Sequence, residues 1–327
     1  MEVTTLVVLI VLVGLIFDYT NGFHDAANVV STVIATKALK PVVAIVIAGI
    51  LNMVGATQIG GIAHTITTGL IETHGVTEWM VICAVVGAII WNLVTWYFEV
   101  PSSSSYALLG GMLGSAWVHL GGSIILWKGF IFKVFLPMIF SPLIGFSLAY
   151  CLMKILSHYY SGRKDARIFR FLQIGSSSIV ALAHGLNDAQ KSMAIITLGL
   201  FAAGAVTSTQ IPFWVILACA VTMGLGTAFG GARLIRTMGF HITKLDPIQG
   251  FAAEMSASCV ILLASVFGMP LSSTHIIAGG ITGVGSARGA SAVKWIIAHK
   301  ILVAMVLTIP GAALFAGVLN WIILYLI

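Results

Sequence analysis

Eight long runs of mostly apolar residues follow one another along this chain, and they restrict its fold more than any single motif. The runs cover residues 3–20, 41–59, 79–98, 131–156, 174–200, 212–232, 250–268 and 301–326. An apolar run of about 20 residues can cross a hydrocarbon core of about 30 Å as an α-helix. Counting two shorter runs at 104–120 and 275–287, the sequence predicts an all-α polytopic membrane protein with about ten to twelve membrane segments.

Composition excludes a soluble domain, because 59% of the residues are apolar and only 8% are charged. No basic stretch precedes the first run, so we expect a membrane helix there and not a signal peptide. The four cysteines are scattered singly, which predicts neither a disulfide framework nor a metal cofactor. Much of the net charge of +6 lies in one central stretch that no aromatic stacking platform accompanies, so no nucleic-acid partner is expected. By the positive-inside rule we interpret this stretch as a cytoplasmic loop; its basic residues are Lys154, Arg163, Lys164, Arg167 and Arg170.

A polar octapeptide occurs twice inside these apolar runs. The first copy spans residues 21–28 (NGFHDAAN) and the second spans residues 184–191 (HGLNDAQK), at a shift of 163 positions. Glycine, aspartate and alanine recur in register. Because an Asn-Gly pair disfavours a regular helix, the first copy predicts a break or kink in its helix.

A second pair of motifs predicts two re-entrant helical hairpins, over residues 79–120 and 248–287. Each has an apolar helix, a tip that begins at Pro101 or Pro270 and contains several serines, and then a shorter helix. The two tips match at a shift of 169 positions, and the first carries no basic residue. Irregular backbone at membrane depth is tolerated where it lines a cavity or is buried in protein.

The order and spacing of these motifs predict a duplicated chain with two inverted-topology repeats. The first repeat is expected at residues 1–157 and the second at 174–327, joined by the cytoplasmic basic loop at 158–173. Each half has three spans and a hairpin, which is an odd number of crossings. We therefore expect a multi-pass protein of the cell (inner) membrane with both termini on the outside. Broken elements that meet at the midplane are typical of secondary transporters.

Charges at the bilayer centre are candidates for function. Asp25 and Asp188 occupy equivalent positions in the two copies and should approach each other. Half-helix N-termini and hydroxyl donors at the hairpin tips favour a small tetrahedral oxyanion, phosphate or sulfate. The candidate anion-binding residues are Asn21, Ser103, Ser104, Ser105, Asn187, Lys191, Ser272, Ser273 and Thr274.

The charges of such a site require bound cations. Asp25 and Asp188 contribute −2, Lys191 contributes +1 and a phosphate brings −1 to −2, which leaves −2 to −3 in a medium of low dielectric. Hard oxygen ligands favour Na⁺ over a transition metal, and protonation of the aspartates would serve equally by charge. Protonated phosphate can also donate a hydrogen bond to a carboxylate, whereas sulfate cannot. The candidate Na⁺ ligands are Asp25, Asn28, Asp188, Gln190 and Glu254.

Each group also has a structural interpretation that the sequence leaves open. The two aspartates could cap helices, the serines could be small packing residues, and Lys191 could extend towards the interface. Glu254 could form a structural hydrogen bond. Asp18 and Glu99 have no equivalent acid in the other half.

At these motifs the chain resembles the inorganic phosphate transporter (PiT) family of cation-coupled symporters. Residues 184–191 are similar to its repeated Gly-x-Asn-Asp motif, and residues 21–28 differ by carrying His24 before the aspartate. Residues 250–254 and 270–275 are similar to its Gly-Phe-x-Ala-Glu and Pro-x-Ser-x-Thr-His motifs, while Tyr106 replaces the histidine of the first tip. The resemblance covers nearly the whole chain. It implies phosphate transport, with Asp25, Asn187, Asp188 and the tip hydroxyls at the site.

We therefore expect a Na⁺-coupled symporter of inorganic phosphate that works by alternating access, with Na⁺ as coupling ion and no other cofactor. The alternatives are a H⁺-coupled phosphate permease, a sulfate permease of the same fold and an anion channel. An enzyme is not expected, since the chain has no His-Glu-x-x-His, Gly-x-Ser-x-Gly or P-loop motif. The expected partners are phosphate, Na⁺ and the lipid bilayer, and a homodimer is the candidate assembly.

Overall fold

The structure, a computed structural model, describes residues 3–58, 61–160 and 165–326, and most of them are helical. Within these ranges there is no β-strand, and the only extended pairing is two isolated β-bridges. The predicted all-α fold is confirmed. The first half contains α1 (Val3–Ala35), α2 (Pro41–Ala56), α3 (Gly61–Thr68), η1 (Thr73–Gly75), α4 (Glu78–Tyr97), α5 (Ser104–Leu120), η2 (Gly122–Ile124), α6 (Trp127–Phe130), η3 (Ile131–Phe135) and α7 (Leu136–Tyr159). The second half contains α8 (Asp165–Ala202), α9 (Phe213–Phe229), α10 (Ala232–Arg236), η4 (Thr237–His241), α11 (Pro247–Val266), α12 (Ser273–Arg288), η5 (Ala290–Ala292) and α13 (Trp295–Leu326).

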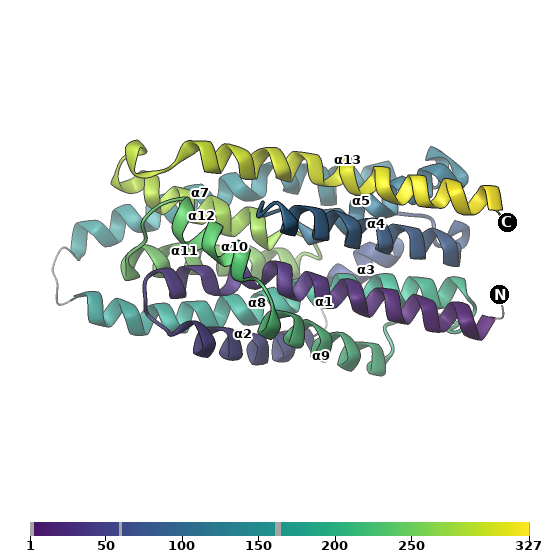
Figure 1. The fold of residues 1–327 in the computed structure, drawn as a ribbon, viewed down its shortest axis with the longest axis horizontal. Coiled ribbons are helices and arrows are strands. Elements are labelled where there is room, and N and C mark those ends of the chain that lie inside the picture. The colour runs from purple at the N-terminus through teal and green to yellow at the C-terminus, as the bar shows by residue number, and fades with distance from the viewer. Residues whose placement is uncertain (1–2, 59–60, 161–164, 327) are drawn as a thin grey trace.

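The long helices lie side by side along the longest axis of the molecule (Figure 1). Both chain ends lie at one end of the bundle, and α7 is joined to α8 at the other. Each half of the chain therefore starts and finishes at opposite ends of the molecule. As a consequence α1 and α8, which carry the two octapeptides, run in opposite directions.

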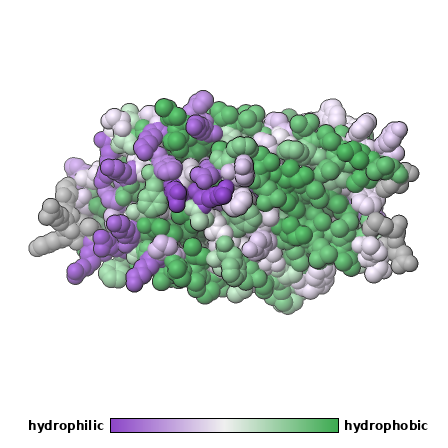
Figure 2. Space-filling model, in the orientation of Figure 1, coloured by the Kyte–Doolittle hydropathy of each residue, from purple (hydrophilic) through white to green (hydrophobic). Residues whose placement is uncertain are grey.

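The outer surface is apolar over the middle of the bundle, and hydrophilic residues gather towards the end where α7 meets α8 (Figure 2). Exposed side chains on this surface include Leu12 of α1 and Leu302 and Trp321 of α13. Among the described residues, five helices are long and apolar enough to cross a membrane, or up to seven if each of two bent helix pairs is one span. These features confirm a multi-pass membrane protein.

The number of full-length apolar spans is lower than the ten to twelve segments counted from the sequence, because that count included shorter pieces. The hairpin helices α5 and α12 have 17 and 16 residues. Helix α8 has 38 residues but carries many polar side chains.

Two apolar cores flank the octapeptides. One contains Val30 of α1 and Val180 of α8, together with residues of α11 and α12. The other contains Phe17 of α1 and Leu198 of α8, together with residues of α4 and α5. Since α1 and α8 contribute to both cores on either side of their polar residues, the octapeptides form a polar layer between two apolar ones.

The predicted break at Asn21-Gly22 is wrong, because α1 is one helix of 33 residues through the first octapeptide. The glycine has a different role. A Cβ at Gly22 would lie 2.6 Å from the carbonyl oxygen of Met223 on α9, and one at Gly185 would lie 2.1 Å from that of Asn52 on α2. Both glycines thus let a neighbouring helix backbone come close to an octapeptide.

The bends lie in the next elements of each half. Helices α2 and α3 are inclined by 66° to each other, and α9 is inclined by 59° to the segment from α10 to His241. Gly231, with φ of +91°, adopts the left-handed conformation immediately before α10. Each half therefore contains a bent helix pair, at a place where the sequence did not predict one.

Packed helix pairs lie where the two hairpins were predicted, as α4–α5 and α11–α12, and their re-entrant course stays a prediction. Their first helices end in the same way, with left-handed residues Glu99 (φ +58°) and Gly268 (φ +62°) at equivalent positions. Their second helices start at capping serines, since Ser103 accepts a hydrogen bond from the Tyr106 amide and Ser272 accepts one from the His275 amide.

The central loop is shorter than the predicted 158–173. Helix α7 continues to Tyr159 and α8 begins at Asp165, so most of the predicted loop is helical. Arg167 and Arg170 therefore lie on the first turns of α8. Arg163 and Lys164 lie outside the described residues.

Candidate functional site

The two octapeptides and the two hairpin tips converge on one buried polar cluster. Its groups are contributed by α1, α8 and the starts of α5 and α12, which are far apart in sequence. Every side chain in it is shielded from solvent by the surrounding helices. The members that hydrogen-bond within it are Asn21, Asp25, Asn28, Ser104, Ser105, Asn187, Asp188, Lys191, Ser273 and Thr274.

Asp25 is held by hydroxyls from both hairpin tips. Ser104 Oγ donates to Asp25 Oδ2 at 2.7 Å, and Thr274 Oγ1 donates to Oδ1 at 3.3 Å. Ser104 Oγ also lies 2.5 Å from Asn21 Oδ1. His24 contributes Nδ1 at 3.2 Å from Asp25 Oδ1. In this half of the cluster, amide and hydroxyl oxygens therefore lie close to the carboxylate oxygens of Asp25.

Asp188 is held by a hydroxyl and an ammonium group. Ser105 Oγ donates to Asp188 Oδ1 at 2.7 Å, and Lys191 Nζ lies 2.5 Å from the same oxygen. The ammonium also contacts Asn187 Oδ1 at 2.6 Å and the carbonyl oxygen of Leu271 at 2.7 Å. Lys191 is thus anchored inside the protein, and the alternative that it extends towards the membrane interface is wrong.

His184 lies between the two aspartates, a position that the sequence did not assign to it. Its Nε2 lies 3.3 Å from Asp188 Oδ2 and 3.8 Å from Asp25 Oδ2. One ligand atom from each of these three residues falls within 4.8 Å of the others, a spacing that suits a bound cation. The helical spacing of four residues from His184 to Asp188 was the available signal.

The tautomer of His184 follows from its other neighbours. Thr227 Oγ1 donates to the Met223 carbonyl at 3.0 Å, so it accepts from Asn52 Nδ2 at 2.8 Å. Asn52 then presents Oδ1 to His184 Nδ1 at 3.3 Å, and Nδ1 must carry the hydrogen. In its neutral form His184 would direct the lone pair of Nε2 towards two carboxylates, an arrangement that a cation between them would stabilise, whereas a doubly protonated ring would itself donate to Asp188 Oδ2.

Two of the predicted tip residues have capping roles. The hydroxyl oxygens of Ser103 and Ser272 accept from backbone amides of their own helices, as described above. The hydroxyls that face the octapeptides are those of Ser104, Ser105, Ser273 and Thr274. Both capped helix starts direct unpaired N–H groups and a positive dipole end towards the cluster, which favours an anion.

Gln190 and Glu254 lie apart from the cluster. Gln190 binds the Leu186 carbonyl at 2.7 Å and accepts from the Ala63 amide at 3.3 Å. Glu254 forms a second buried cluster, where it accepts from Thr32, from Ser176 and from Gln173 Nε2. Glu254 thus retains oxygen-rich surroundings, two helix turns of α1 away from Asp25.

The two acids without equivalents differ from each other. Asp18 on α1 is fully buried beside Ser192 of α8 and the backbone of Met223 on α9. Glu99 is exposed at the end of α4. It shares its left-handed backbone conformation with Gly268, the equivalent residue of the second half.

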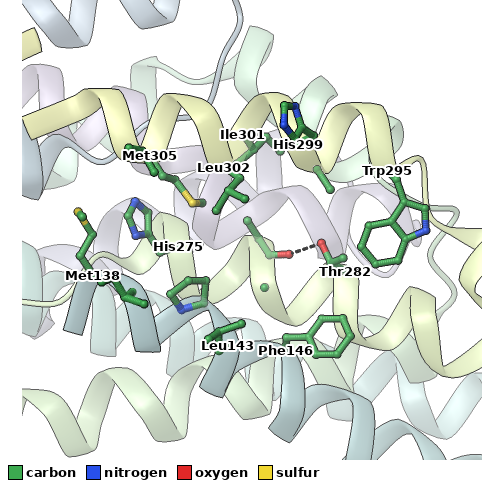
Figure 3. Close-up of a pocket in the computed structure, with 16 residues that line it drawn as sticks. Met138, Leu143, Phe146, His275, Thr282, Trp295, His299, Ile301, Leu302 and Met305 are labelled. Carbon is green, nitrogen blue, oxygen red and sulfur yellow. Dashed lines mark hydrogen bonds between the residues drawn. The ribbon is translucent and has the colours of Figure 1, made fainter. Parts of the chain in front are cut away.

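The large cavity of about 730 Å³ between α7, α12 and α13 is not the polar cluster. Figure 3 shows its walls, which are mostly apolar side chains such as Leu143, Phe146 and Leu302. His275, the neighbour of Thr274, reaches one side of this cavity. An inorganic anion would find few polar partners there.

Comparison with known proteins agrees with this geometry. Residues 21–316 match the phosphate transporter family. The chain belongs to this family. A probable low-affinity inorganic phosphate transporter of Rhizobium meliloti (strain 1021) is 44% identical over 317 residues, which cover 95% of each protein. One of Bacillus subtilis (strain 168) is 40% identical over 324 residues and 97% of each protein.

A solved structure of a sodium-dependent phosphate transporter has the same fold. It superposes with a TM-score of 0.91, covers 99% of this chain and 100% of its own, and shares 23% sequence identity. The predicted family resemblance is confirmed. Because the family and these relatives are transporters, the prediction of a transporter and not an enzyme is confirmed as well.

Proposed function

We propose that this protein is a cation-coupled symporter of inorganic phosphate, with Na⁺ as the coupling ion. The observation that carries the proposal is the gap between His184 Nε2 and the Oδ2 atoms of Asp25 and Asp188. With neutral His184, three acceptors face one another in a buried site, and a cation between them would offset their repulsion. A further anion could enter such a site only together with positive charge, which is the physical basis of coupling.

Phosphate is the anion that the site and the family both favour. The relatives named above are inorganic phosphate transporters. A phosphate hydroxyl can donate to a carboxylate oxygen, and its other oxygens can accept from the tip hydroxyls and helix N-termini. Sulfate has no such donor near neutral pH, so a sulfate permease is the weaker alternative.

Burial of the cluster supports alternating access. Asp25 and Asp188 are at most 1% exposed, and an apolar core flanks them on either side. An ion can therefore enter only if helices separate on one side. A permanently open anion channel would need a continuous polar path, which these two cores interrupt.

Inverted repeats would provide such a movement in two symmetric directions. Support comes from the opposite course of the two halves and from residues at equivalent positions that meet, such as Tyr106 and His275 with ring centroids 5.0 Å apart. The hydrophilic end at the α7–α8 connection supports a cytoplasmic location for that end and an outside location for both termini (Figure 2). The homodimer stays a prediction.

Uptake of labelled phosphate into proteoliposomes tests the function. An inward Na⁺ gradient at equal internal and external pH should drive accumulation above equilibrium, and replacement of Na⁺ by choline should remove it. Accumulation under a pH gradient without Na⁺ would instead assign H⁺ coupling. Strong competition by sulfate would assign a sulfate permease, and uptake that only equilibrates would indicate a channel.

Replacing the tip serines tests the anion site. The double substitution Ser104→Ala and Ser273→Ala removes two hydroxyls that border the cluster. Each lost hydrogen bond to an anion is worth about 1 kcal/mol, so for two of them we expect the phosphate concentration for half-maximal uptake to rise about 30-fold. Ser178→Ala is the matched control, since its hydroxyl binds the Ile174 carbonyl outside the cluster. An unchanged half-maximal concentration in the double variant would show that these tip hydroxyls serve in packing and do not bind phosphate.

A further inference from the structure

We propose that Lys191 is a built-in cation that takes the place of one coupling ion, so that the Asp188 half of the site needs no external one. The proposal rests on cation-coupled symport, as proposed above. It concerns how many ions accompany phosphate and which half of the site binds them.

The surroundings of the Lys191 ammonium resemble the ligand shell of a small metal ion. Four oxygen atoms lie between 2.5 and 2.7 Å from Nζ, from Ser105, Asn187, Asp188 and the Leu271 carbonyl. An ammonium has only three hydrogens to donate, so these oxygens gather around a point charge and exceed its hydrogen-bonding capacity. The set of carboxylate, amide, hydroxyl and backbone carbonyl is one that Na⁺ also accepts.

In the first octapeptide the position equivalent to Lys191 is occupied by an uncharged residue. Asn28 is the equivalent of Lys191 at the shift of 163, and Thr274 is the equivalent of Ser105 at the shift of 169. Asn28 Nδ2 donates to Thr274 Oγ1 at 2.8 Å, just as Lys191 Nζ donates to Ser105 Oγ at 2.6 Å. The two halves therefore pair an octapeptide with the opposite hairpin tip in the same way, but only one half carries a fixed positive charge.

The charge balance then differs between the halves. Asp188 is neutralised by Lys191 at 2.5 Å. The neighbours of Asp25 within hydrogen-bond distance are the hydroxyls of Ser104 and Thr274 and the ring of His24. The coupling ion that the two Oδ2 atoms could bind is then needed to balance the charges of Asp25 and the phosphate, and not that of Asp188. A tethered ammonium also costs no ion-binding entropy and stays in place at any external Na⁺ concentration.

The lysine also connects α8 with both hairpin tips. It joins α8 to Ser105 in the first tip and to Leu271 in the second. A charge held at this place keeps both hairpin tips at the cluster. Its removal should leave an oxygen-lined space that depends on a diffusible cation.

The test replaces Lys191 by asparagine, the residue that the first octapeptide has at this position. In detergent, Na⁺ in place of choline should raise the melting temperature of Lys191→Asn by about 3 °C more than that of the wild type, since Na⁺ now binds an additional site in the folded state. In proteoliposomes, uptake by this variant should require one additional Na⁺ per phosphate and show a steeper dependence on Na⁺.

Lys191→Met is the matched control, because methionine removes the charge but fills most of the space. It should gain no additional stabilisation by Na⁺. Equal Na⁺ stabilisation of wild type, Lys191→Asn and Lys191→Met would overturn the proposal, and so would a Lys191→Asn protein that cannot be recovered folded even in Na⁺. The melting experiment is independent of transport. Failure of wild-type proteoliposomes to accumulate phosphate would instead refute the proposed symport.

Discussion

Replacing Asp25 by asparagine is expected to abolish coupled phosphate uptake while leaving the protein folded. Asparagine keeps the shape of the side chain but loses the charge, and its NH₂ group would face hydroxyl donors that now serve the carboxylate. Loss of one charged ligand and its charge-assisted hydrogen bonds weakens cation binding by about 2.7 kcal/mol, or about 100-fold. Initial rates of Na⁺-driven uptake in proteoliposomes measure the effect.

Glu72→Gln is the control for the loss of a carboxylate, because Glu72 is exposed in the connection between α3 and α4. It should transport like the wild type. Size-exclusion chromatography and the melting temperature should show that Asp25→Asn is folded. Coupled uptake at the wild-type rate in this variant would remove Asp25 from the cation site.

The hairpins and the pairing of the two octapeptides were predictable because polar residues inside apolar runs are rare and costly. A proline followed by serines between two apolar helices has few structural interpretations in a membrane. The duplication then placed Asp25 and Asp188 together without any knowledge of distances. The structure agrees, since both aspartates face His184.

The role of Gly22 was not predictable in the same way. A glycine in an apolar helix can allow a break, or it can allow close approach of a neighbouring helix, and the local sequence is the same in both cases. The residue that decides is Met223 on α9, about 200 positions away. The predicted break failed for this reason.

If the second octapeptide is taken as one continuous helix, the sequence alone indicates which of its residues can face the site and which cannot. Residues three or four positions apart share a helix face, so His184, Asp188 and Lys191 point the same way. Gln190 follows Asp188 by two positions, about 200° around the helix, and binds α3 instead. The surroundings of Glu254 depend on Ser176 and Gln173 of another helix, which no local pattern relates to it.

Replacing Gly185 by alanine is expected to disturb both stability and transport, because its Cβ would lie 2.1 Å from the Asn52 carbonyl oxygen. Backbone cannot rotate away as a side chain can, so α2 and α8 must separate. Such overpacking typically costs about 1–3 kcal/mol. The movement also displaces Asn52, which orients His184 between the two aspartates. We therefore expect a lower melting temperature and at least a 10-fold slower coupled uptake, by the conversion of about 1.4 kcal/mol per factor of ten.

Gly175→Ala on the same helix is the matched control, since nothing lies within 4 Å of the added Cβ. There the substitution should be neutral or stabilising by up to about 1 kcal/mol, as alanine favours a helix more than glycine does. If both variants melted and transported alike, close approach of α2 would not be what Gly185 provides. A loss at Gly185 alone would link the repeated glycine to the geometry of the site. Gly185 brings Asn52 within reach of His184, and His184 lies between the two carboxylates that we propose as cation ligands.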